Sequence, residues 1–489
     1  MADRTDLAGL LDAMTGVRLI CVGDVMLDRF VYGTVDRISP EAPIPIVRVD
    51  HEDAMLGAAG NVARNAASLG AETTLLAVVG ADPAAEEVRA LAAARPGLDA
   101  ALVVDPARPT TIKTRYVAAG QQILRADRET ALALADDHRQ DVLSLFEKHI
   151  GDTDVVVISD YGKGVLDAET LGRLIGIARA AGKPVIADPK RPAFSAYRGV
   201  TVIKPNVHEL SLATGRDCRD TETLVTAAAD MLRDADIDAA LVSRAERGLS
   251  LVRRSGDAEH FTGTAKQVFD VSGAGDTVVA AAGVALGAGA DLAAAAALAH
   301  FAGAIVVGKV GTATVTPAEL RAGALAENEA KIQSAEQTVE VTRRWRSQQL
   351  TVGFTNGVFD LLHPGHVALL QAAKTRCDRL IVGLNSDASV RRLKGPGRPV
   401  QDEHARAIVL ASLAAVDGVV VFAEDTPAEL IDRLRPDVLV KGADYRPDQV
   451  VGAAAVRSWG GEVWLAPVLE GNSSSGTIAR IRKRQHRED

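Results

Sequence analysis

Residues 270–277 read Asp-Val-Ser-Gly-Ala-Gly-Asp-Thr, and a helical pattern follows directly over residues 277–286. Two glycines just before a helix allow consecutive backbone N–H groups to point at one spot, where they form an anion site with the helix N-terminus. Asp276 stands beside that spot, and a carboxylate there suits the work of a general base. The stretch therefore indicates phosphoryl transfer. A glycine turn with a capping aspartate is the alternative that this pattern alone leaves open.

The chain before and around this stretch alternates between apolar, strand-like runs and helical patterns. The strand-like runs end in polar residues and cover 17–22, 155–159, 185–187, 200–203 and 239–242. The alternation predicts an α/β fold with a doubly wound parallel sheet, which binds its ligands at the carboxyl ends of the strands. Residues 30–49 and 101–125 break the rhythm, and we expect them to form a small additional sheet over the site.

Three further motifs place polar or small residues at strand ends. Gly57-Ala-Ala-Gly-Asn61 begins a helix with residues small enough for a ligand to approach closely. Asn206 and Glu209 follow a strand and lie on one helix face, where they can orient a magnesium ion and phosphates through water. Asp24 and Asp28 follow the first strand and can bind sugar hydroxyls. A tight helix start and a helix cap are the structural alternatives for the first two motifs.

In this order the motifs resemble the ribokinase family of sugar kinases, over about residues 17–317. The resemblance implies Asp276 as the base and an anion hole made by Gly273, Ala274 and Gly275. It also implies contacts to ATP and Mg²⁺ from Asn206, Glu209, Ser243 and Gly248, and contacts to the sugar from Asp24, Asp28, Gly57 and Asn61. The small sheet would be a lid, which in this family often mediates dimers. One departure is that the family usually reads Gly-Gly-Ala-Ala-Asn at residues 57–61.

The second half of the chain predicts a smaller domain of the same class. Residues 326–349 are polar and helical, and we expect them to be a linker helix between a first domain (1–325) and a second (350–489). Strand-like runs then restart at 350–355, 379–384, 418–422, 437–440 and 462–466, with helical patterns between them. We expect a Rossmann-like parallel α/β domain of normal size.

The strongest motif of this half is Thr355-Asn-Gly-Val-Phe-Asp-Leu-Leu-His-Pro-Gly-His366. It follows a strand and opens a helix. Two imidazoles at a helix N-terminus, His363 and His366, can bind a triphosphate and stabilise the charge on departing pyrophosphate. No nearby set of cysteines and histidines completes a zinc site, so we expect no structural metal.

This motif resembles the cytidylyltransferase-like family, whose hallmark is His-x-Gly-His. In that family the substrate's own phosphate oxygen attacks the α-phosphate of the nucleotide. The resemblance implies nucleotide and phosphate contacts from Thr355, Asn356, Gly357, Phe359, Asp360, Gly365, Asn385, Asp387, Lys394, Arg406, Lys441, Asp444, Ser473, Ser474 and Ser475. The family usually carries a glutamate two residues before Arg406, where this chain has His404.

Strings such as Gly23-Asp-Val-Met-Leu-Asp-Arg29 and Ser159-Asp-Tyr-Gly-Lys-Gly164 go beyond the signatures of the two families. With them, the two halves together resemble the family of bifunctional enzymes that make ADP-heptose for lipopolysaccharide. The resemblance implies phosphorylation of D-glycero-β-D-manno-heptose 7-phosphate at O1, and adenylyl transfer from ATP to the heptose 1-phosphate. Cationic partners for the 7-phosphate would be Lys113, Arg115 and Arg125, and exposed sheet charge is their structural alternative. Two alternatives stay open: a kinase for another sugar phosphate joined to a CTP-using transferase, or one catalytically silent, regulatory domain.

Composition limits the other classes of protein. The formal net charge of −9 argues against nucleic acid and anionic membranes as partners. Three scattered cysteines form neither a disulfide framework nor a zinc site. The N-terminus shows no signal-peptide pattern, and no long apolar run predicts a membrane span. We expect a cytoplasmic homodimer whose ligands are ATP and heptose phosphates, with Mg²⁺.

Overall fold

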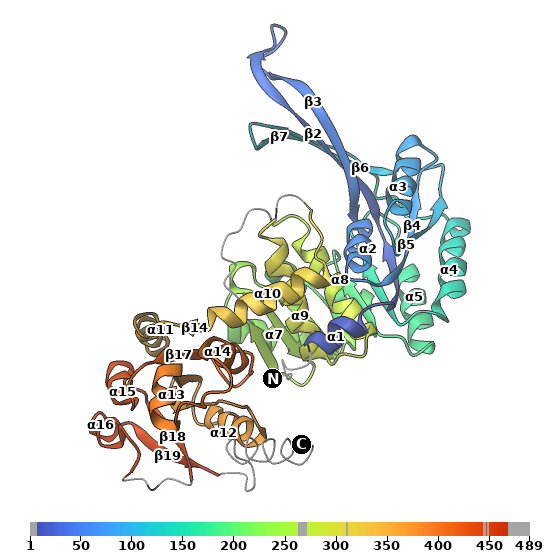
Figure 1. Ribbon diagram of the computed structural model, residues 1–489. Helices are drawn as coiled ribbons and strands as arrows, with labels where there is room; N and C mark the ends of the chain where they lie inside the picture. The colour runs from blue at the N-terminus through green and yellow to red at the C-terminus, as the bar shows by residue number, and fades with distance from the viewer. Residues whose placement is uncertain (1–6, 263–270, 310–311, 444–445, 447–448, 468–489) are drawn as a thin grey trace, which may run out of the picture. The chain divides into compact units, whose positions relative to one another are not determined.

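The computed structural model describes residues 7–262, 271–309, 312–443, 446 and 449–467. The chain forms two compact units, which divide between Arg321 and Ala322, within helix α10 (Pro317–Ala330). In Figure 1 the N-terminal unit runs from blue to yellow and the C-terminal unit from yellow to red. None of the described helices is long and apolar enough to cross a membrane.

A nine-stranded sheet forms the centre of the N-terminal unit, in the order β13-β12-β11-β10-β9-β8-β1-β4-β5. From β11 to β5 all neighbours are parallel, and β12 and β13 add antiparallel strands at one edge. The predicted doubly wound sheet is confirmed. In chain order the strands are β1 (Arg18–Gly23), β4 (Glu72–Val79), β5 (Leu98–Val104), β8 (Val155–Ser159), β9 (Val185–Asp188), β10 (Val202–Ile203), β11 (Ala239–Ser243), β12 (Leu249–Arg253) and β13 (Ala258–Phe261).

Helices cover both faces of this sheet because side chains alternate between the faces along each strand. In β1, Leu19 and Cys21 belong to one apolar cluster, and Ile20 and Val22 to the other. The first cluster includes α2 (Ala59–Ser68), α3 (Pro83–Ala93), α8 (Ala274–Gly287) and α9 (Leu292–Val306). The second includes α4 (Asp136–Ile150), α5 (Ala168–Ala180), α6 (Val207–Thr214) and α7 (Thr221–Ala235).

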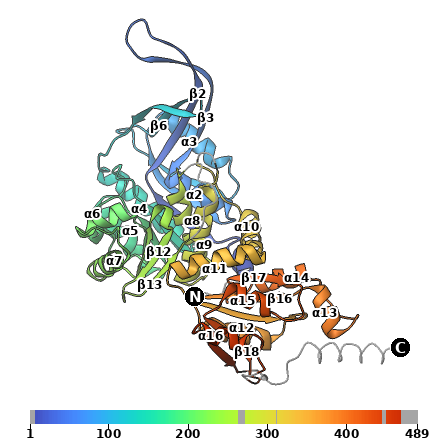
Figure 2. The ribbon, with the colours of Figure 1, turned by 90° about the vertical axis from the view of Figure 1, so that its left-hand side faces the viewer.

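A separate four-stranded sheet, here called the lid, has the order β3-β2-β6-β7. It consists of β2 (Val25–Ile38), β3 (Pro45–Ala58), β6 (Thr111–Ala118) and β7 (Gln121–Arg128), and the β2–β3 hairpin projects from the unit (Figure 1 and Figure 2). The predicted additional sheet is confirmed, with one correction. Residues 101–104 belong to β5 in the main sheet, because β5 pairs in parallel with β4 and buries Val103.

The C-terminal unit is built on a six-stranded parallel sheet in the order β14-β17-β16-β15-β18-β19. Its strands are β14 (Ile332–Gln333), β15 (Val352–Gly357), β16 (Arg379–Asn385), β17 (Gly418–Phe422), β18 (Val438–Gly442) and β19 (Glu462–Ala466). Its helices are α11 (Ala335–Ser347), α12 (Pro364–Lys374), α13 (Asp387–Lys394), α14 (Glu403–Ala411), α15 (Ala428–Leu434) and α16 (Ala453–Ser458). The segment 326–349, expected as a linker helix, contains the end of α10, β14 and α11, and β14 pairs with β17.

Candidate active sites

Asp276 lies in the first turn of α8, at the carboxyl edge of the main sheet. Gly273 caps this helix with φ 77°, in the left-handed region that favours glycine. The Asp276 carboxyl is buried and accepts hydrogen bonds from Asn61 Nδ2 at 2.7 Å and from the Tyr161 hydroxyl at 2.8 Å. Burial raises the pKa of Asp276 to about 6, and the nearby Asp188 carboxylate acts in the same direction. A base with a pKa close to the working pH suits proton transfer from a hydroxyl.

A buried cation lies beside the predicted anion hole. A Cβ atom added at Gly275 would stand 3.0 Å from Lys204 Nζ. Because glycine has no side chain, the Lys204 ammonium can lie next to the N-terminus of α8. Lys204 forms a buried ion pair with Asp188 at 3.0 Å. Burial alone would lower the pKa of Lys204, but the ion pair with Asp188 raises it, so the side chain is charged. Sequence reasoning missed Lys204, although it ends a strand directly before Pro205-Asn206.

Asn206 and Glu209 form a complete capping box at the start of α6. The Asn206 side chain accepts from the Glu209 N–H at 2.8 Å, and Glu209 Oε2 accepts from the Asn206 N–H at 2.9 Å. Glu209 Oε1 accepts from Lys190 Nζ at 2.7 Å. The backbone of Asn206 bridges to Ser243, whose hydroxyl has no hydrogen-bond partner among the described residues. Gly248 permits close strand packing, because a Cβ there would stand 2.1 Å from the Phe261 carbonyl oxygen.

The residues expected to bind the sugar fall into two groups. Asp28 Oδ1 accepts from an Arg115 guanidinium nitrogen at 2.6 Å, and a Cβ at Gly57 would stand 2.3 Å from Asp28 Oδ2, so these three residues come together. Lys113 is the Cα partner of Asp28 across the lid strands. Arg125 is the Cα partner of Arg115 across β6 and β7, but its side chain pairs with Asp127 at 3.0 Å on the exposed strand β7.

The Asp24 carboxylate, expected to bind the sugar, accepts hydrogen bonds from backbone N–H groups in the structure. Its buried carboxylate accepts from the N–H groups of Tyr161 at 2.8 Å, Lys163 at 3.0 Å and Val165 at 3.4 Å. Burial raises the pKa of Asp24, and the hydrogen bonds from Lys163 and Tyr161 act against this increase. In this structure, therefore, Asp24 holds the loop after β8.

A buried polar network joins α2 to α8 around Asn61. Asn61 Oδ1 accepts from an Arg64 nitrogen at 2.9 Å, and the Asn61 carbonyl accepts from Asn65 Nδ2 at 2.9 Å. The Thr277 hydroxyl donates to Asn65 Oδ1 at 3.0 Å. Arg64 and Asn65 were missed in the sequence because a helical pattern does not show which polar residues turn inward. The network fixes Asn61 against Asp276.

In the C-terminal unit, His363 caps α12 and His366 lies in its first turn. Their rings stack with centroids 3.7 Å apart, and the Phe359 ring lies 5.0 Å from His366. Burial lowers the pKa of His363, and burial together with the neighbouring His363 lowers the pKa of His366 to about 4. Both rings are therefore neutral near pH 7, and neither Nδ1 atom has a partner among the described residues.

Arg406 and Asp360 organise the loops around these histidines. Arg406 is buried and donates to the carbonyls of Gln401, Val358 and Asn385 at 2.7–3.0 Å, and to Asp387 Oδ1 at 2.7 Å. Asp360 pairs with Arg398 and accepts from the Val400 N–H at 2.6 Å. Glu403 Oε2 accepts from the Asp387 N–H at 2.7 Å, so Glu403 supplies a carboxylate one residue before the exposed His404.

The remaining predicted contacts among this unit's described residues lie in β15, β16 and β18 and in the helices α12 and α13. The Thr355 hydroxyl and Asn356 Oδ1 are buried without hydrogen-bond partners among the described residues, and Lys441 Nζ donates to the Asn356 carbonyl at 2.8 Å. Gly357 lies against Phe359, and Gly365 is the second residue of α12. Asn385 Nδ2 donates to the Ser389 hydroxyl at 3.1 Å, and Lys394 is exposed at the end of α13. Asp444, Ser473, Ser474 and Ser475 lie outside the described residues.

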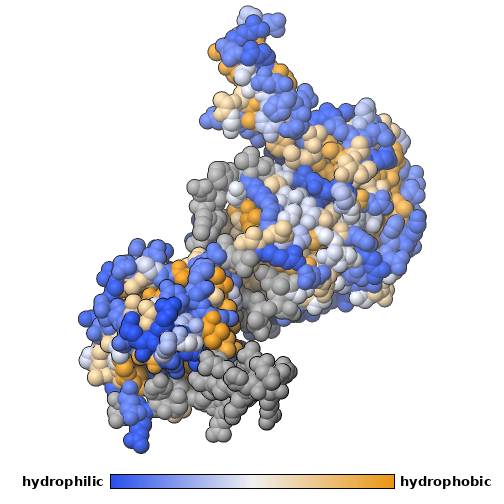
Figure 3. Space-filling view, in the orientation of Figure 1, coloured by the Kyte–Doolittle hydropathy of each residue, from blue (hydrophilic) through white to orange (hydrophobic). Residues whose placement is uncertain are grey.

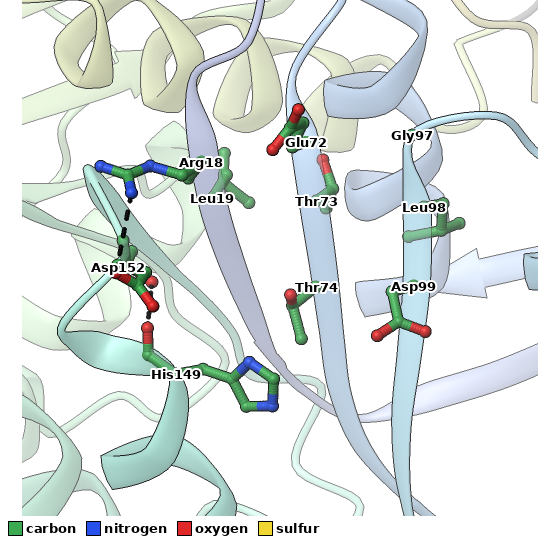
Figure 4. Close-up of a pocket in the computed structure, with 11 residues that line it drawn as sticks. Arg18, Leu19, Glu72, Thr73, Thr74, Gly97, Leu98, Asp99, His149 and Asp152 are labelled. Carbon is green, nitrogen blue, oxygen red and sulfur yellow. Dashed lines mark hydrogen bonds and ion pairs between the residues drawn. The ribbon is translucent and has the colours of Figure 1, made fainter.

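A pocket of about 520 Å³ opens at the opposite edge of the N-terminal unit's sheet (Figure 4). Arg18, Glu72 and Leu98 line it and begin β1, β4 and β5. None of the residues expected in the kinase site lines this pocket. Parallel α/β sheets bind ligands at the carboxyl ends of their strands, and Asp276 lies at that edge, away from this pocket.

Comparisons with known proteins agree with this geometry. The family model for pfkB family carbohydrate kinases matches residues 18–319, and the model described as cytidylyltransferase-like matches residues 354–480. Two curated proteins named Bifunctional protein HldE are similar along nearly the whole chain. The one from Paramagnetospirillum magneticum is 51% identical over 98% of this chain and 99% of its own. The one from Caulobacter vibrioides is 52% identical over 97% of this chain and 99% of its own.

Among solved structures, Arabidopsis thaliana ribokinase has a TM-score of 0.51 at 19% identity, and covers 63% of this chain and 98% of its own. Phosphofructokinase-2 from Escherichia coli has a TM-score of 0.53 at 22% identity, and covers 63% of this chain and 97% of its own. At such identities the likeness concerns the fold alone. The full-length similarity confirms the resemblance found in the sequence. The chain therefore belongs to the family of bifunctional HldE proteins, with a pfkB-type carbohydrate kinase and a cytidylyltransferase-like nucleotidyltransferase in one polypeptide.

Proposed function

We propose that the N-terminal unit phosphorylates O1 of D-glycero-β-D-manno-heptose 7-phosphate with ATP, and that the C-terminal unit joins the heptose 1-phosphate to AMP from ATP. The observation that carries the first activity is the buried Asp276 carboxyl at the N-terminus of α8, with its raised pKa. The choice of heptose rests on the resemblance to the bifunctional enzymes that make ADP-heptose, which the full-length similarity to the HldE proteins supports. The functional boundary falls within residues 326–349, and both reactions take place in the cytoplasm, where ATP is available.

In the kinase reaction, Asp276 accepts the proton of the O1 hydroxyl. The O1–phosphorus bond forms at the γ-phosphate, the bond to the β-phosphate oxygen breaks, and ADP leaves. The N–H groups at Gly273 and Gly275, with Lys204 beside them, stabilise the phosphoryl group in transit. The Ala274 N–H donates to the Val271 carbonyl at 3.2 Å, and would have to share that hydrogen bond to join the anion hole. Asp28 and Arg115 hold the sugar and its 7-phosphate, with Lys113 nearby.

Magnesium would arrive with ATP. Mg²⁺ is commonly held by one or two carboxylates, water and the substrate phosphates. Glu209 fits this role beside Asn206, because Lys190, which is half-exposed and can move away, is the one partner of its Oε1 atom among the described residues. The ion would neutralise phosphate charge. Asn206 and Glu209 would hold it through water.

In the transferase reaction, an oxygen of the sugar 1-phosphate attacks the α-phosphorus of ATP. The bond from the α-phosphorus to the bridging oxygen breaks, and pyrophosphate leaves. His363 and His366 donate hydrogen bonds to the phosphates from neutral rings, since both have lowered pKa values. Asn356 and Thr355, at the end of the strand before this motif's helix, offer further polar atoms that have no hydrogen-bond partner among the described residues.

Phosphorus NMR of the full chain with magnesium ATP and heptose 7-phosphate tests the assignment. We expect the 1,7-bisphosphate to appear, and ADP-heptose with pyrophosphate after a phosphatase specific for the 7-position is added. CTP should not replace ATP in the second step. Turnover of another sugar phosphate, or of CTP, in place of these substrates would keep the two activities and overturn the heptose assignment.

A homodimer formed through the lid is part of the proposal. Large apolar side chains are exposed along the projecting hairpin, where Figure 3 shows them scattered among hydrophilic residues. They are Val35, Ile38, Ile44 and Val49. Burying such side chains against a second copy would stabilise association. Sedimentation should give a dimer for the wild type and a monomer for Ile38→Lys with Ile44→Lys, and a monomeric wild type would contradict the proposal.

A further inference from the structure

The loop after β8 is held in one conformation by two buried carboxylates. Asp24 accepts hydrogen bonds from the backbone N–H groups of residues 161, 163 and 165. Asp160 accepts from the Gly162 N–H at 2.8 Å and from the Tyr197 hydroxyl at 2.7 Å. Asp160 also accepts from Arg191 Nε at 3.0 Å. Six donors on two buried carboxylates therefore fix the backbone on both sides of Tyr161. Its side chain therefore leaves the loop in a defined direction.

That direction brings Tyr161 to the reacting carboxyl. The Tyr161 hydroxyl donates to Asp276 Oδ1, and Asn61 donates to Oδ2. One donor on each oxygen fixes the rotation of the carboxyl plane. A carboxylate offers about four acceptor positions, so about two remain, and one of them can accept from the sugar hydroxyl. Burial raises the pKa of Tyr161 well above its ordinary value, which keeps the hydroxyl a donor.

The Tyr161 ring also contacts the side of the site assigned to the nucleotide. Lys190 Nζ lies 5.5 Å from the ring centroid, a cation–π distance, and Lys190 pairs with Glu209. The Tyr161 side chain thus contacts both Asp276 and Lys190, and Lys190 pairs with Glu209, which is expected near the phosphates.

We propose that Tyr161 is a positioning residue of the kinase reaction, which holds the Asp276 carboxylate in the orientation needed to take the hydroxyl proton. The proposal rests on the function proposed for Asp276. If Tyr161 only filled space, removal of its hydroxyl would change stability and leave proton transfer unaffected.

The hydrogen bond has a consequence for titration. It favours the charged form of Asp276 and so lowers its pKa against the effect of burial. Loss of the hydroxyl raises that pKa. The acid limb of the pH profile, where the kinase rate falls as the pH is lowered, then moves to higher pH. The other polar or titratable groups facing Asp276 stay in place: Asn61, Asp188, Lys204, Arg64 and Cys21.

Tyr161→Phe removes one oxygen and keeps the ring. We expect the kinase kcat to fall by about tenfold or more, the acid limb to move up, and the KM for ATP to stay within about twofold. Adenylyl transfer by the same chain should not change. Thr153→Val is the control, since it removes a buried hydroxyl, which donates to the His149 carbonyl at 2.9 Å, at the opposite edge of the sheet. An unmoved acid limb in Tyr161→Phe, or an equal shift in Thr153→Val, overturns the proposal.

A second readout needs no sugar. In protein labelled with ¹³C at aspartate carboxyls, the Asp276 signal is the one missing from Asp276→Asn. This signal should titrate at higher pH in Tyr161→Phe than in the wild type, and equal titration also counts against the proposal. Failure of the heptose assignment would leave this measurement untouched, so the two failures are distinguishable.

Discussion

On the proposed mechanism, the Asp276 carboxyl sets the pH dependence of the kinase. Its pKa of about 6 lies above the ordinary value of 3.8, because burial disfavours the charged form. Only the ionised form accepts a proton, so kcat/KM should be constant above the pKa and fall about tenfold per pH unit below it. Asp276→Asn should lower the kinase rate by at least about 100-fold.

Release of ADP measures this reaction, and release of pyrophosphate by the transferase in the same samples is the control. A kinase profile that stays flat down to pH 5 would remove Asp276 as the titrating base.

The stacked histidines give the transferase a different profile. The pKa of His366 is lowered to about 4, so the ring is neutral across the usual range of pH. If neutral rings donate the hydrogen bonds, kcat/KM for ATP in adenylyl transfer stays flat from pH 7 to about 5. If a cationic His366 were required, the rate would rise about tenfold per pH unit as the pH falls. His366→Ala should lower the transfer rate by about 100-fold or more and leave the kinase rate unchanged.

At the scale of residues, the sequence identified the groups that local spacing places together. Asp276 with its glycines and His363 with His366 lie within one turn of a helix start, so their motifs are visible in the chain. Tyr161 and Lys204 were missed as members of the site. They reach Asp276 from the ends of β8 and β10, and only the order of strands in the sheet reveals that convergence.

At the junction between β3 and α2, this chain has alanine at position 58 and glycine at position 60, where the family pattern has glycine and alanine. Ala58 has φ 52° and ψ −125°, in a region that glycine favours, while Gly60 lies within the helix. Such a conformation costs a non-glycine residue about 1–3 kcal/mol. A Cβ at Gly60 would stand 2.9 Å from Leu56 Cβ, and overpacking of this kind costs about 1–3 kcal/mol.

We therefore expect Ala58→Gly to stabilise the N-terminal unit by about 1 kcal/mol and Gly60→Ala to destabilise it. The double variant, which restores the usual family order, should lie between the two. Urea unfolding followed by hydrogen exchange of peptides from this unit measures the difference. A destabilised Ala58→Gly variant would show that the local backbone is not strained.

Two basic residues that the sequence assigned to phosphate have separate roles in the structure. Arg406 uses its donors on three carbonyls and Asp387, whereas Lys394 is exposed. A lysine cannot reach these acceptors together, so Arg406→Lys should destabilise the C-terminal unit by about 3 kcal/mol and abolish transfer. Lys394→Ala should change stability by less than about 0.5 kcal/mol and raise the KM for ATP. Equal stability of the two variants would contradict this division.

At the scale of elements, the bounds of strands and helices were predicted well where the apolar residues form a clear run or repeat. Val155–Ser159, Gly418–Phe422 and Glu462–Ala466 are strands with the expected bounds. The start of the segment 101–125 was assigned to the wrong sheet, because an apolar run does not identify its partner strand. The two-residue strand β14 shows no period at all, and its pairing with β17 follows only from the folded sheet.

At the scale of the whole molecule, the product of the first reaction is not the substrate of the second. On the proposed function, the kinase makes a 1,7-bisphosphate, whereas the transferase uses the 1-phosphate. The 7-phosphate must be removed between the two steps by another enzyme. The intermediate therefore leaves the protein, and joining the two units in one chain does not require a tunnel between the sites.

Mixing two single-site variants tests this independence. Asp276→Asn keeps the transferase, and His366→Ala keeps the kinase. An equimolar mixture with the phosphatase should form ADP-heptose at about half the rate of the same total amount of wild type, because each activity is present in half of the chains and distant sites act independently. Neither variant alone should form it. A mixture far slower than this, with both remaining half-reactions intact, would mean that the two sites must belong to one chain.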